Sequence, residues 1–394
     1  MTVDRVVIAG AGLAGLRTLE ELRAGGYGGE VTLIGAEPRP PYDRPPLSKA
    51  VLAGTVTDTT LRDGADLAAL RADVRLGESA TGLADGVLRT TGGEYPFDQL
   101  VLATGAAPRF LPGPGPQRSL RTLDDALALH ALLRPGLRLA IAGAGWIGAE
   151  LATAAAAKGC QVTVVEAAPV PLAAALGTEV GGHLSRWYAD AGIELRLSTG
   201  VGSVEPGGLA LDGGSWLAAD EVVTAIGARP QLDWLAGSGV AVDGCVLVDE
   251  SLRSSVPGVF AVGDCSAFMS RRYGRRLRFE HWDVAMRAPE VVAANLLGGR
   301  EHYDPVPYFW SEQFGRMVQY VGLHSPSDRL IWRGDPGADK FGACWLAGDR
   351  LTALLSVGAP KDLMQARRLI TAGASVDPGR IADPAVPVRA AAVS

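Results

Sequence analysis

Near the start of the chain the spacing of apolar residues changes from a continuous run to a helical repeat. An apolar run over 6–9 is followed by a glycine-rich turn, and then by leucines at helical spacing over 16–22. A second apolar run, over 31–34, leads to Glu37. This order predicts a strand, a helix and a second strand, joined as a β-α-β unit.

The same order returns about 130 residues later. An apolar run over 138–142 meets a second glycine-rich turn, an alanine-rich helical segment and another apolar run that ends at Glu166. The separation is too long for a solenoid repeat, whose period is about 20–50 residues, so it indicates two copies of one unit. Beyond Pro305 the pattern becomes aromatic and alternating, which predicts antiparallel strands over 308–314, 317–323 and 350–357, followed by a helix over 360–373.

Each glycine-rich turn has the spacing G-x-G-x-x-G directly after a strand. In such turns the first glycine permits the tight bend, the second allows the backbone to approach a pyrophosphate, and the third lets helix and strand pack closely. Two copies therefore predict two bound dinucleotides. The acidic side chain of Glu166 favours a free ribose 2′-hydroxyl over a 2′-phosphate, which points to NADH rather than NADPH. The glycines concerned are Gly10, Gly12 and Gly15, then Gly143, Gly145 and Gly148.

Composition narrows the class of protein. The chain has 394 residues with a net charge of −6, which argues against a general nucleic-acid binder. The four cysteines lie far apart and form no C-x-x-C pair, so a zinc ribbon, an iron–sulfur ligand set and a redox dithiol are not expected. The five histidines show no metal-binding spacing. Without an apolar leader or a long apolar run, we expect a cytoplasmic protein that does not bind membranes.

Several motifs together resemble the flavoprotein reductases of the glutathione-reductase fold, and more narrowly the NADH-dependent ferredoxin and rubredoxin reductases that serve oxygenases and cytochromes P450. The motifs are R-P-P-Y-D-R-P-P-L-S-K, A-T-G-A-A-P-R, G-A-G-W-I-G-A-E, A-V-G-D-C, F-E-H-W and P-Y-F-W-S-E-Q-F-G. The resemblance covers nearly the whole chain. It implies an α/β fold with two Rossmann-like dinucleotide-binding domains and a C-terminal α+β domain.

The resemblance also implies domain limits. The FAD-binding domain would be discontinuous, over 1–112 and 236–305, with the NAD-binding domain inserted at 113–235. The C-terminal domain would span 306–394. One departure from the family pattern is Ala288-Pro289, where a Gln-Gly pair is usual. Because proline is best tolerated in the first helical turn, the helix there is expected to begin or bend differently.

Residue by residue, the resemblance implies an FAD site and an NADH site. The FAD site would comprise Gly10, Gly12, Leu13, Ala14, Gly15, Glu37, Arg44, Pro46, Lys49, Ala80, Ala103, Thr104, Gly105, Arg109, Arg121, Gly263, Asp264, Glu280, His281, Trp282 and Trp310. The NADH site would comprise Gly143, Gly145, Trp146, Ile147, Gly148, Glu150, Glu166, Ile226 and Gly227.

Four of these residues are candidates for the chemistry itself, namely Lys49, Glu150, Trp282 and Trp310. A lysine beside the flavin would stabilise the negative charge that reduction places on the ring, and a carboxylate would hold that lysine in place. The alternatives are that Lys49 and Glu150 do not meet, and that the two tryptophans are ordinary core residues.

The implied function is transfer of hydride from NADH to FAD and of single electrons onward to an iron–sulfur ferredoxin. An acidic ferredoxin would be steered by the basic stretch Arg271, Arg272, Arg275, Arg276 and Arg278, whose alternative is a solvated hairpin with its turn at Tyr273-Gly274. Two other functions remain open. One is reduction of rubredoxin or a quinone, and the other is a redox-sensing protein similar to apoptosis-inducing factor.

Overall fold

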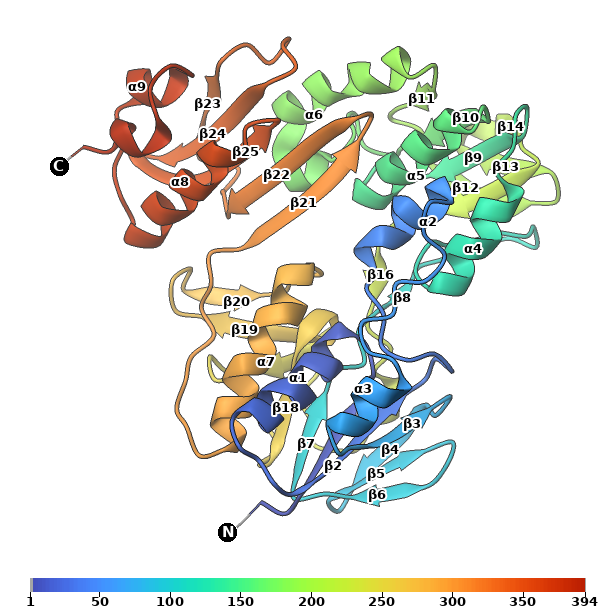
Figure 1. Cartoon of the computed structure of the whole chain (residues 1–394). Coiled ribbons are helices and arrows are strands. Elements are labelled where there is room, and N and C mark those ends of the chain that lie inside the picture. Colours follow the sequence, from blue (N-terminus) through green and yellow to red (C-terminus); the bar gives the residue numbers. More distant parts are fainter. Residues whose placement is uncertain (1–2, 394) are drawn as a thin grey trace. The chain divides into compact units, whose positions relative to one another are not determined.

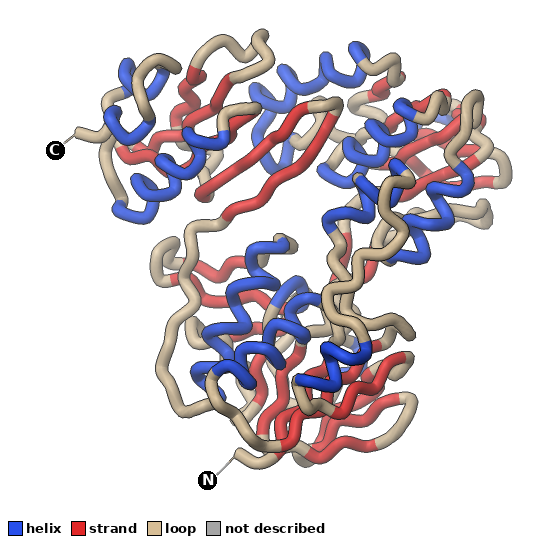
Figure 2. The backbone as a smooth tube through the Cα atoms, in the orientation of Figure 1, coloured by secondary structure: helices blue, strands red, loops and turns tan. Residues whose placement is uncertain are grey.

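The computed structural model describes residues 3–393, and its contacts divide the chain into two compact units. The first unit comprises the chain up to Pro45, Asp58–Ala107 and Ala228–Pro305. The second comprises Pro46–Thr57, Pro108–Gly227 and the chain from Val306 onward. Figures 1 and 2 show the elements of both. The sequence did not indicate that Pro46–Thr57 belongs with the second unit, and the three-domain division remains a prediction.

The first unit is built on a parallel sheet in the order β18-β7-β1-β2-β3. Strand β1 lies between β2 and β7, with Ile8 opposite Leu33 on one side and Val101 on the other. Helix α1 buries Leu16, Leu19 and Leu22, as their helical spacing predicts, and packs beside α7 (Figure 1). The main elements of this unit are β1 (Arg5–Ala9), α1 (Leu13–Ala24), β2 (Glu30–Gly35), α3 (Gly64–Ala69), β3 (Asp73–Leu76), β7 (Gln99–Leu102), β18 (Val259–Ala261) and α7 (Trp282–Leu296).

Smaller sheets complete the first unit. Strands β4, β5 and β6 form an antiparallel meander, and β17-β19-β20 form a second small sheet in which β19 and β20 make a hairpin. The turn of that hairpin falls at 271–274, where Tyr273-Gly274 was expected. The bounds are β4 (Ala80–Ala84), β5 (Val87–Thr90), β6 (Glu94–Pro96), β16 (Ala228–Arg229), β17 (Val246–Val248), β19 (Ser266–Ser270) and β20 (Arg275–Leu277), with β8 (Ala107–Pro108) where the chain leaves the unit.

Helix α7 runs through Pro289 rather than beginning there. The helix starts at Trp282, so Pro289 lies in its interior and is buried together with Ala288. Proline at this position removes the backbone bond to residue 285 and crowds that carbonyl. The helix tolerates the loss because its buried face carries Val284, Ala288, Val292 and Leu296.

The second unit repeats the parallel architecture. Its sheet has the order β11-β10-β9-β15, with Ile141 of β9 opposite Val164 and Val223, and α5 packs against it. The chain between β11 and β15 forms an antiparallel sheet of β12, β13 and β14. The elements are α2 (Ala50–Ala53), α4 (Leu123–Leu132), β9 (Arg138–Ala142), α5 (Trp146–Ala157), β10 (Gln161–Val165), α6 (Ala173–Asp190), β11 (Glu194–Arg196), β12 (Val201–Glu205), β13 (Gly208–Leu211), β14 (Trp216–Ala218) and β15 (Glu221–Thr224).

The C-terminal part of this unit is an antiparallel sheet in the order β21-β22-β25-β24-β23. Three of its strands and helix α8 match the predicted elements, whereas β23 and β24 were not predicted. The bounds are β21 (Tyr308–Gln313), β22 (Arg316–Gly322), β23 (Arg329–Arg333), β24 (Phe341–Ala347), β25 (Arg350–Val357), α8 (Pro360–Ala372) and α9 (Pro378–Ala382). Two parallel β-α-β sheets and an antiparallel C-terminal sheet with helices agree with the predicted fold class. Among residues 3–393, no helix is long and apolar enough to cross a membrane.

Candidate functional site

The first glycine-rich turn has no room for a side chain at two of its three glycines. A Cβ on Gly10, whose φ is +120°, would lie 2.1 Å from the carbonyl oxygen of Ala103. A Cβ on Gly15 would lie 1.8 Å from the carbonyl oxygen of Gly10. A Cβ on Gly12, in contrast, meets no atom within 4 Å. The first and third glycines therefore pack the turn, while the second borders open space at the start of α1.

The second turn repeats this geometry. A Cβ on Gly143, whose φ is +106°, would lie 2.5 Å from the carbonyl oxygen of Ala225, and one on Gly148 would lie 2.0 Å from that of Gly143. Gly145 again borders open space. Gly12 and Gly145 are the N-cap residues of α1 and α5, with φ of −80° and −78°. Both helices thus begin at a bare backbone, with their first N–H groups available to a pyrophosphate.

Glu37, at the end of the first β-α-β unit, is engaged by two side chains of the segment that follows it. The Tyr42 hydroxyl donates to Glu37 Oε2 at 2.5 Å, and Arg44 Nη2 donates to Glu37 Oε1 at 2.5 Å. Arg44 also donates to the Tyr42 oxygen at 2.9 Å. A carboxylate has about four acceptor sites, so Glu37 retains capacity for ribose hydroxyls while it fixes Arg44.

Glu166, at the equivalent place in the second copy, is held by backbone groups instead. The Ala144 N–H donates to Glu166 Oε2 at 2.7 Å, and the Ala168 N–H donates to Oε1 at 2.9 Å. Ala144 lies between Gly143 and Gly145, so the carboxylate is tied directly to the glycine-rich turn. In this copy the acidic residue is therefore hydrogen-bonded to the same turn that would bind the pyrophosphate.

The remaining FAD-site candidates of the first unit lie at the ends of its strands. Ala103, Thr104 and Gly105 follow β7, and Gly263 and Asp264 follow β18. A Cβ on Gly263 would lie 3.2 Å from the Ala14 Cβ, which places that turn against the first residues of α1. Because β7 and β18 are parallel neighbours, the loops that follow them lie at the same edge of the sheet. Ala80 begins β4 in the antiparallel meander.

The start of α7 is tied to the segment that carries Arg44. Trp282 Nε1 donates to Asp43 Oδ1 at 2.8 Å, so Trp282 has a polar anchor that a purely packed core tryptophan lacks. His281 stacks on Phe279, with ring centroids 5.2 Å apart. Burial lowers the pKa of His281 to about 4, although the negative charges of Asp264 and Asp283 act to raise it. Glu280 pairs with Arg278.

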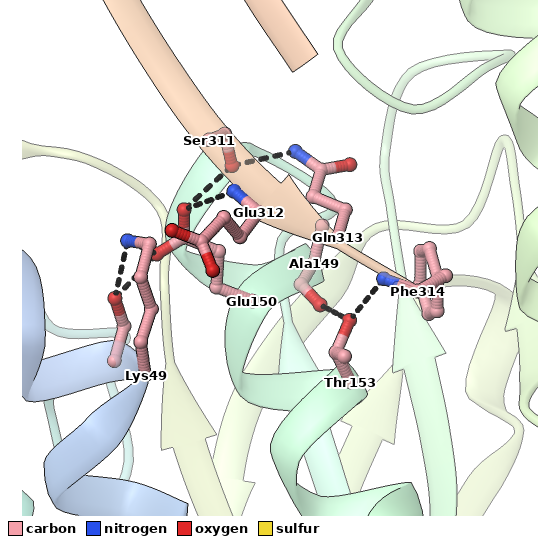
Figure 3. A network of polar contacts seen from close by, with 9 residues as sticks. Lys49, Ala149, Glu150, Thr153, Ser311, Glu312, Gln313 and Phe314 are labelled. Atoms are coloured by element: carbon pink, nitrogen blue, oxygen red, sulfur yellow. Dashed lines mark hydrogen bonds and ion pairs between the residues drawn. The ribbon is translucent and has the colours of Figure 1, made fainter. Parts of the chain in front are cut away.

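Lys49 and Glu150 form an ion pair within the second unit (Figure 3). Lys49 Nζ lies 2.8 Å from Glu150 Oε2. The Glu150 side chain is only 4% exposed and is carried by the fifth residue of α5, the helix that begins at the second glycine-rich turn. The structure therefore brings these two predicted residues together, and it excludes the alternative that they do not meet.

Three further groups donate to the Glu150 carboxylate. Ser48 donates to Oε2, while Ser311 Oγ and the Glu312 N–H donate to Oε1 at 2.6 and 3.2 Å. Sequence reasoning missed both serines, although each lies inside a family motif: Ser48 in P-P-L-S-K and Ser311 in Y-F-W-S-E-Q-F. A small hydroxyl residue beside a predicted charge pair is the signal that could have identified them.

The other candidates of the second unit lie on several of its segments. The Arg109 N–H donates to the Gly227 carbonyl at 3.0 Å, while Ile226 and Ile147 are exposed. Trp146 meets Phe309 of β21 edge-on at 4.4 Å. Pro46 lies in the short 3₁₀ turn before Lys49, and the Arg121 N–H donates to Asp125 beside the cap of α4.

Trp310 lies on β21, where its ring stacks with Tyr308 at 6.0 Å. Trp282 belongs to the first unit and Trp310 to the second, and the role of each beside the flavin stays a prediction.

The cysteines offer no dithiol. All four lie in the described part of the chain and are free, and three of them are buried. Burial raises the pKa of Cys265 to about 11 and that of Cys344 to about 12, which keeps these thiols protonated. Within residues 3–393 no group of three or more His, Cys, Asp or Glu side chains could hold a metal ion.

Comparison with known proteins gives the family. Residues 4–288 match the model described as pyridine nucleotide-disulphide oxidoreductase, and residues 308–392 match that described as reductase C-terminal. The chain is 37% identical to the anthranilate 1,2-dioxygenase system ferredoxin–NAD+ reductase component of Burkholderia cepacia, over 98% of each sequence.

Solved structures agree. The crystal structure of Fdr9 shares 49% identity at a TM-score of 0.94, covering 98% of this chain and 99% of that one. Putidaredoxin reductase, in its covalent complex with putidaredoxin, shares 32% identity at a TM-score of 0.93, covering 98% and 97%. The chain therefore belongs to the pyridine nucleotide-disulphide oxidoreductase family and, within it, to the ferredoxin–NAD+ reductases.

Proposed function

We propose that this protein takes hydride from NADH onto FAD and passes electrons one at a time to an iron–sulfur ferredoxin that serves an oxygenase or a cytochrome P450. The observation that carries the proposal is the presence of two sterically equivalent dinucleotide cradles in one chain. When bound, FAD supplies the conversion between a two-electron donor and a one-electron acceptor, and the protein supplies position and charge.

The two cradles differ in how their acidic residues are partnered, which supports assigning a different dinucleotide to each. The negative charge of Glu37 is balanced by the positive charge of Arg44, as suits a cofactor that stays bound to the protein. Glu166 accepts hydrogen bonds from two backbone N–H groups and would repel a 2′-phosphate, as suits NADH. We assign FAD to the discontinuous domain 1–112 and 236–305, and NADH to 113–235.

Lys49 is the residue we assign to charge stabilisation as the flavin accepts hydride. A cation held in a largely buried position acts strongly on a developing negative charge, because little water screens it. Glu150 would keep the Lys49 ammonium in place, and the donors around Glu150 stabilise its carboxylate without neutralising it. Trp282 and Trp310 would line the flavin.

Electrons would leave through a partner protein rather than through thiols. The four cysteines are free, and burial of Cys265 and Cys344 opposes thiolate formation. Ferredoxin reduction is the activity named for the Burkholderia cepacia relative, and putidaredoxin is the partner named for the solved reductase complex. Free thiols also fit the reducing cytoplasm in which we expect the protein to work.

The β19–β20 hairpin is our proposed landing site for an acidic ferredoxin. Arg271, Arg272, Arg275 and Arg276 are exposed on it. Arg271 is paired with Glu250, and Arg276 donates to the carbonyls of Val248 and Ala267, so these two are held in place rather than freely mobile. A fixed positive patch on a chain of net charge −6 would steer an acidic partner through a local field.

The deciding experiment is NADH-driven reduction of cytochrome c by the FAD-loaded protein, with and without a [2Fe–2S] ferredoxin. We expect strong dependence on ferredoxin, which weakens as ionic strength rises. Fast flavin reduction with no ferredoxin stimulation would indicate a small-molecule reductase. Little flavin reduction by NADH would indicate the redox-sensing alternative.

A further inference from the structure

Strand β21 of the C-terminal sheet reaches into the Lys49–Glu150 pair through one hydroxyl group. Ser311 Oγ donates to Glu150 Oε1 at 2.6 Å, and Figure 3 shows this hydrogen bond between the strand and the carboxylate. The next residue adds its backbone N–H to the same oxygen at 3.2 Å. Oε2 on the other side receives Lys49 and Ser48. One carboxylate is thus held from two directions by two chain segments.

The Ser311 hydroxyl is itself oriented. Gln313 Nε2 donates to Ser311 Oγ at 3.0 Å, so the serine oxygen is occupied as an acceptor and its hydrogen is directed at Glu150. Ser311 is fully buried and Gln313 is 2% exposed. A buried relay of this kind stays fixed, because neither side chain can exchange its partner for water.

A second contact fixes the strand itself against α5. The Phe314 N–H, just beyond β21, donates to Thr153 Oγ1 at 3.0 Å, and Thr153 donates to the carbonyl of Ala149 (Figure 3). Trp146 and Phe309 pack together at the other end of the same interface. Strand β21 is therefore registered to α5 at three points, with Ser311 at the middle one.

We infer that Ser311, oriented by Gln313, is a positioning residue that holds the Glu150 carboxylate and, through it, the ammonium of Lys49. This inference rests on the proposed role of Lys49 at the flavin. Without Ser311 the carboxylate keeps a single longer bond on Oε1 and can rotate about its Cγ–Cδ bond. Lys49 then follows a moving partner, and its charge is no longer fixed where hydride transfer requires it.

The strand has a second consequence through Trp310. Side chains alternate along a strand, so Trp310 and Tyr308 project from the face opposite Ser311 and Gln313. The residue that holds Glu150 and the tryptophan assigned to the flavin are adjacent in sequence. A displacement of β21 would therefore move both together.

The test is a double-mutant cycle on the FAD-loaded full-length protein. Flavin reduction by NADH is followed by stopped-flow absorbance in the parent, Ser311→Ala, Glu150→Gln and the double variant. We expect Ser311→Ala to lower the limiting rate about tenfold, the effect of one charge-assisted hydrogen bond, with the NADH dissociation constant unchanged. In the Glu150→Gln background the same change should have less than about a twofold effect.

A potential measurement separates positioning from general damage. Because Ser311 acts through the Lys49 charge, Ser311→Ala should lower the midpoint potential of bound FAD in the same direction as Lys49→Met, by a smaller amount. Ser356→Ala is the matched control: it removes another buried serine of the same sheet, whose hydroxyl donates to the Ala359 carbonyl, and should change neither rate nor potential. Should Ser311→Ala not fold, Gln313→Met removes only the orienting donor and should produce a weaker loss of the same kind.

Each outcome has a distinct meaning. Equal losses from Ser311→Ala in both backgrounds, or an unchanged rate in the parent background, would overturn the positioning role while leaving the proposed function intact. An unchanged hydride-transfer rate in both Lys49→Met and Glu150→Gln would instead remove the pair from the proposed mechanism.

Discussion

The Ala144 N–H donates to Glu166 Oε2 at 2.7 Å, so the acidic residue assigned to coenzyme choice also braces the glycine-rich turn. The two roles cannot be separated by mutation as simply as the sequence implies. Replacement of Glu166 by arginine removes both the negative charge and the acceptor that holds the turn.

This relationship gives the first prediction. We expect Glu166→Arg to shift the ratio of kcat/KM for NADH over NADPH by at least about tenfold toward NADPH, because the repulsion of a 2′-phosphate is removed. The turn loses its brace, so the NADH dissociation constant should also rise. Steady-state kinetics with both coenzymes check this, with Asp190→Arg as a control of equal charge change at an exposed helix end. Retained NADH preference would show that Glu166 does not govern coenzyme choice.

The second prediction separates two glycines of the same turn. Gly148→Ala places a Cβ 2.0 Å from the Gly143 carbonyl oxygen, so it should destabilise the protein by about 1–3 kcal/mol, as overpacking does. Gly145→Ala adds a methyl group in open space and should leave the unfolding midpoint in urea almost unchanged while weakening NADH binding. Equal effects of the two variants on stability would contradict the different packing roles of these two residues.

The third prediction concerns Lys49. Lys49→Met keeps most of the side-chain stem but removes the charge, and it should slow flavin reduction by NADH about 10- to 100-fold. Stopped-flow measurements at saturating NADH test this. Lys361→Met, which removes an exposed lysine on α8, is the control and should leave that half-reaction unchanged. A parent-like rate in Lys49→Met would place the charge stabilisation elsewhere.

The fourth prediction is a pH dependence that comes from His281. Burial lowers the pKa of His281 to about 4 in the folded protein, below the usual value of 6.5. The unfolded chain therefore binds a proton first as the pH falls, so the stability contributed by neutral His281 is complete above pH 6.5 and is lost between pH 6.5 and 4.

The loss should reach roughly 3 kcal/mol in the free energy of unfolding across that window. Urea unfolding at about pH 7 and about pH 5 measures its upper part. His281→Gln should flatten the pH dependence, while His302→Gln, at an exposed position, should not. An unchanged slope in His281→Gln would assign the effect to other groups.

The fifth prediction concerns the C-terminal sheet. Arg333 is 2% exposed, pairs with Asp362 at 2.7 Å, and donates to the carbonyls of Ile381, Asp383 and Val386. Arg333→Met would leave these acceptors unpaired inside the fold, and we expect a loss of about 3–5 kcal/mol. Urea unfolding gives the value, and Arg329→Met, on the exposed end of the same strand, should cost little. A small loss in Arg333→Met would mean that water replaces the arginine.

Some elements were predictable because their signals are local. The two β-α-β units follow from apolar runs that meet glycine-rich turns, and the first glycine of each turn, Gly10 or Gly143, is required by the positive φ of the bend itself. The strands over 308–313 and 316–322 were predictable for the same reason, since alternation reports one buried face. In β24 most residues are buried, so it shows no alternation to read.

Contacts between distant segments needed the folded chain. The sequence suggested Lys49 and Glu150 as a pair through family resemblance, but Ser48 and Ser311 are ordinary serines until two segments, 102 and 161 residues from Glu150, converge on it. Likewise, nothing local distinguishes Glu166, bound to the turn, from Glu37, bound to Arg44.

The sequence by itself thus determined the duplicated dinucleotide fold, the family and the residue types at the two glycine-rich turns. It could do so because the steric need for glycine and the spacing of apolar residues are both visible within short segments of the chain. Only the tertiary structure decided which donors surround Glu150 and which groups partner each acidic residue, because hydrogen bonds between segments that lie far apart in the chain depend on packing that no local pattern encodes.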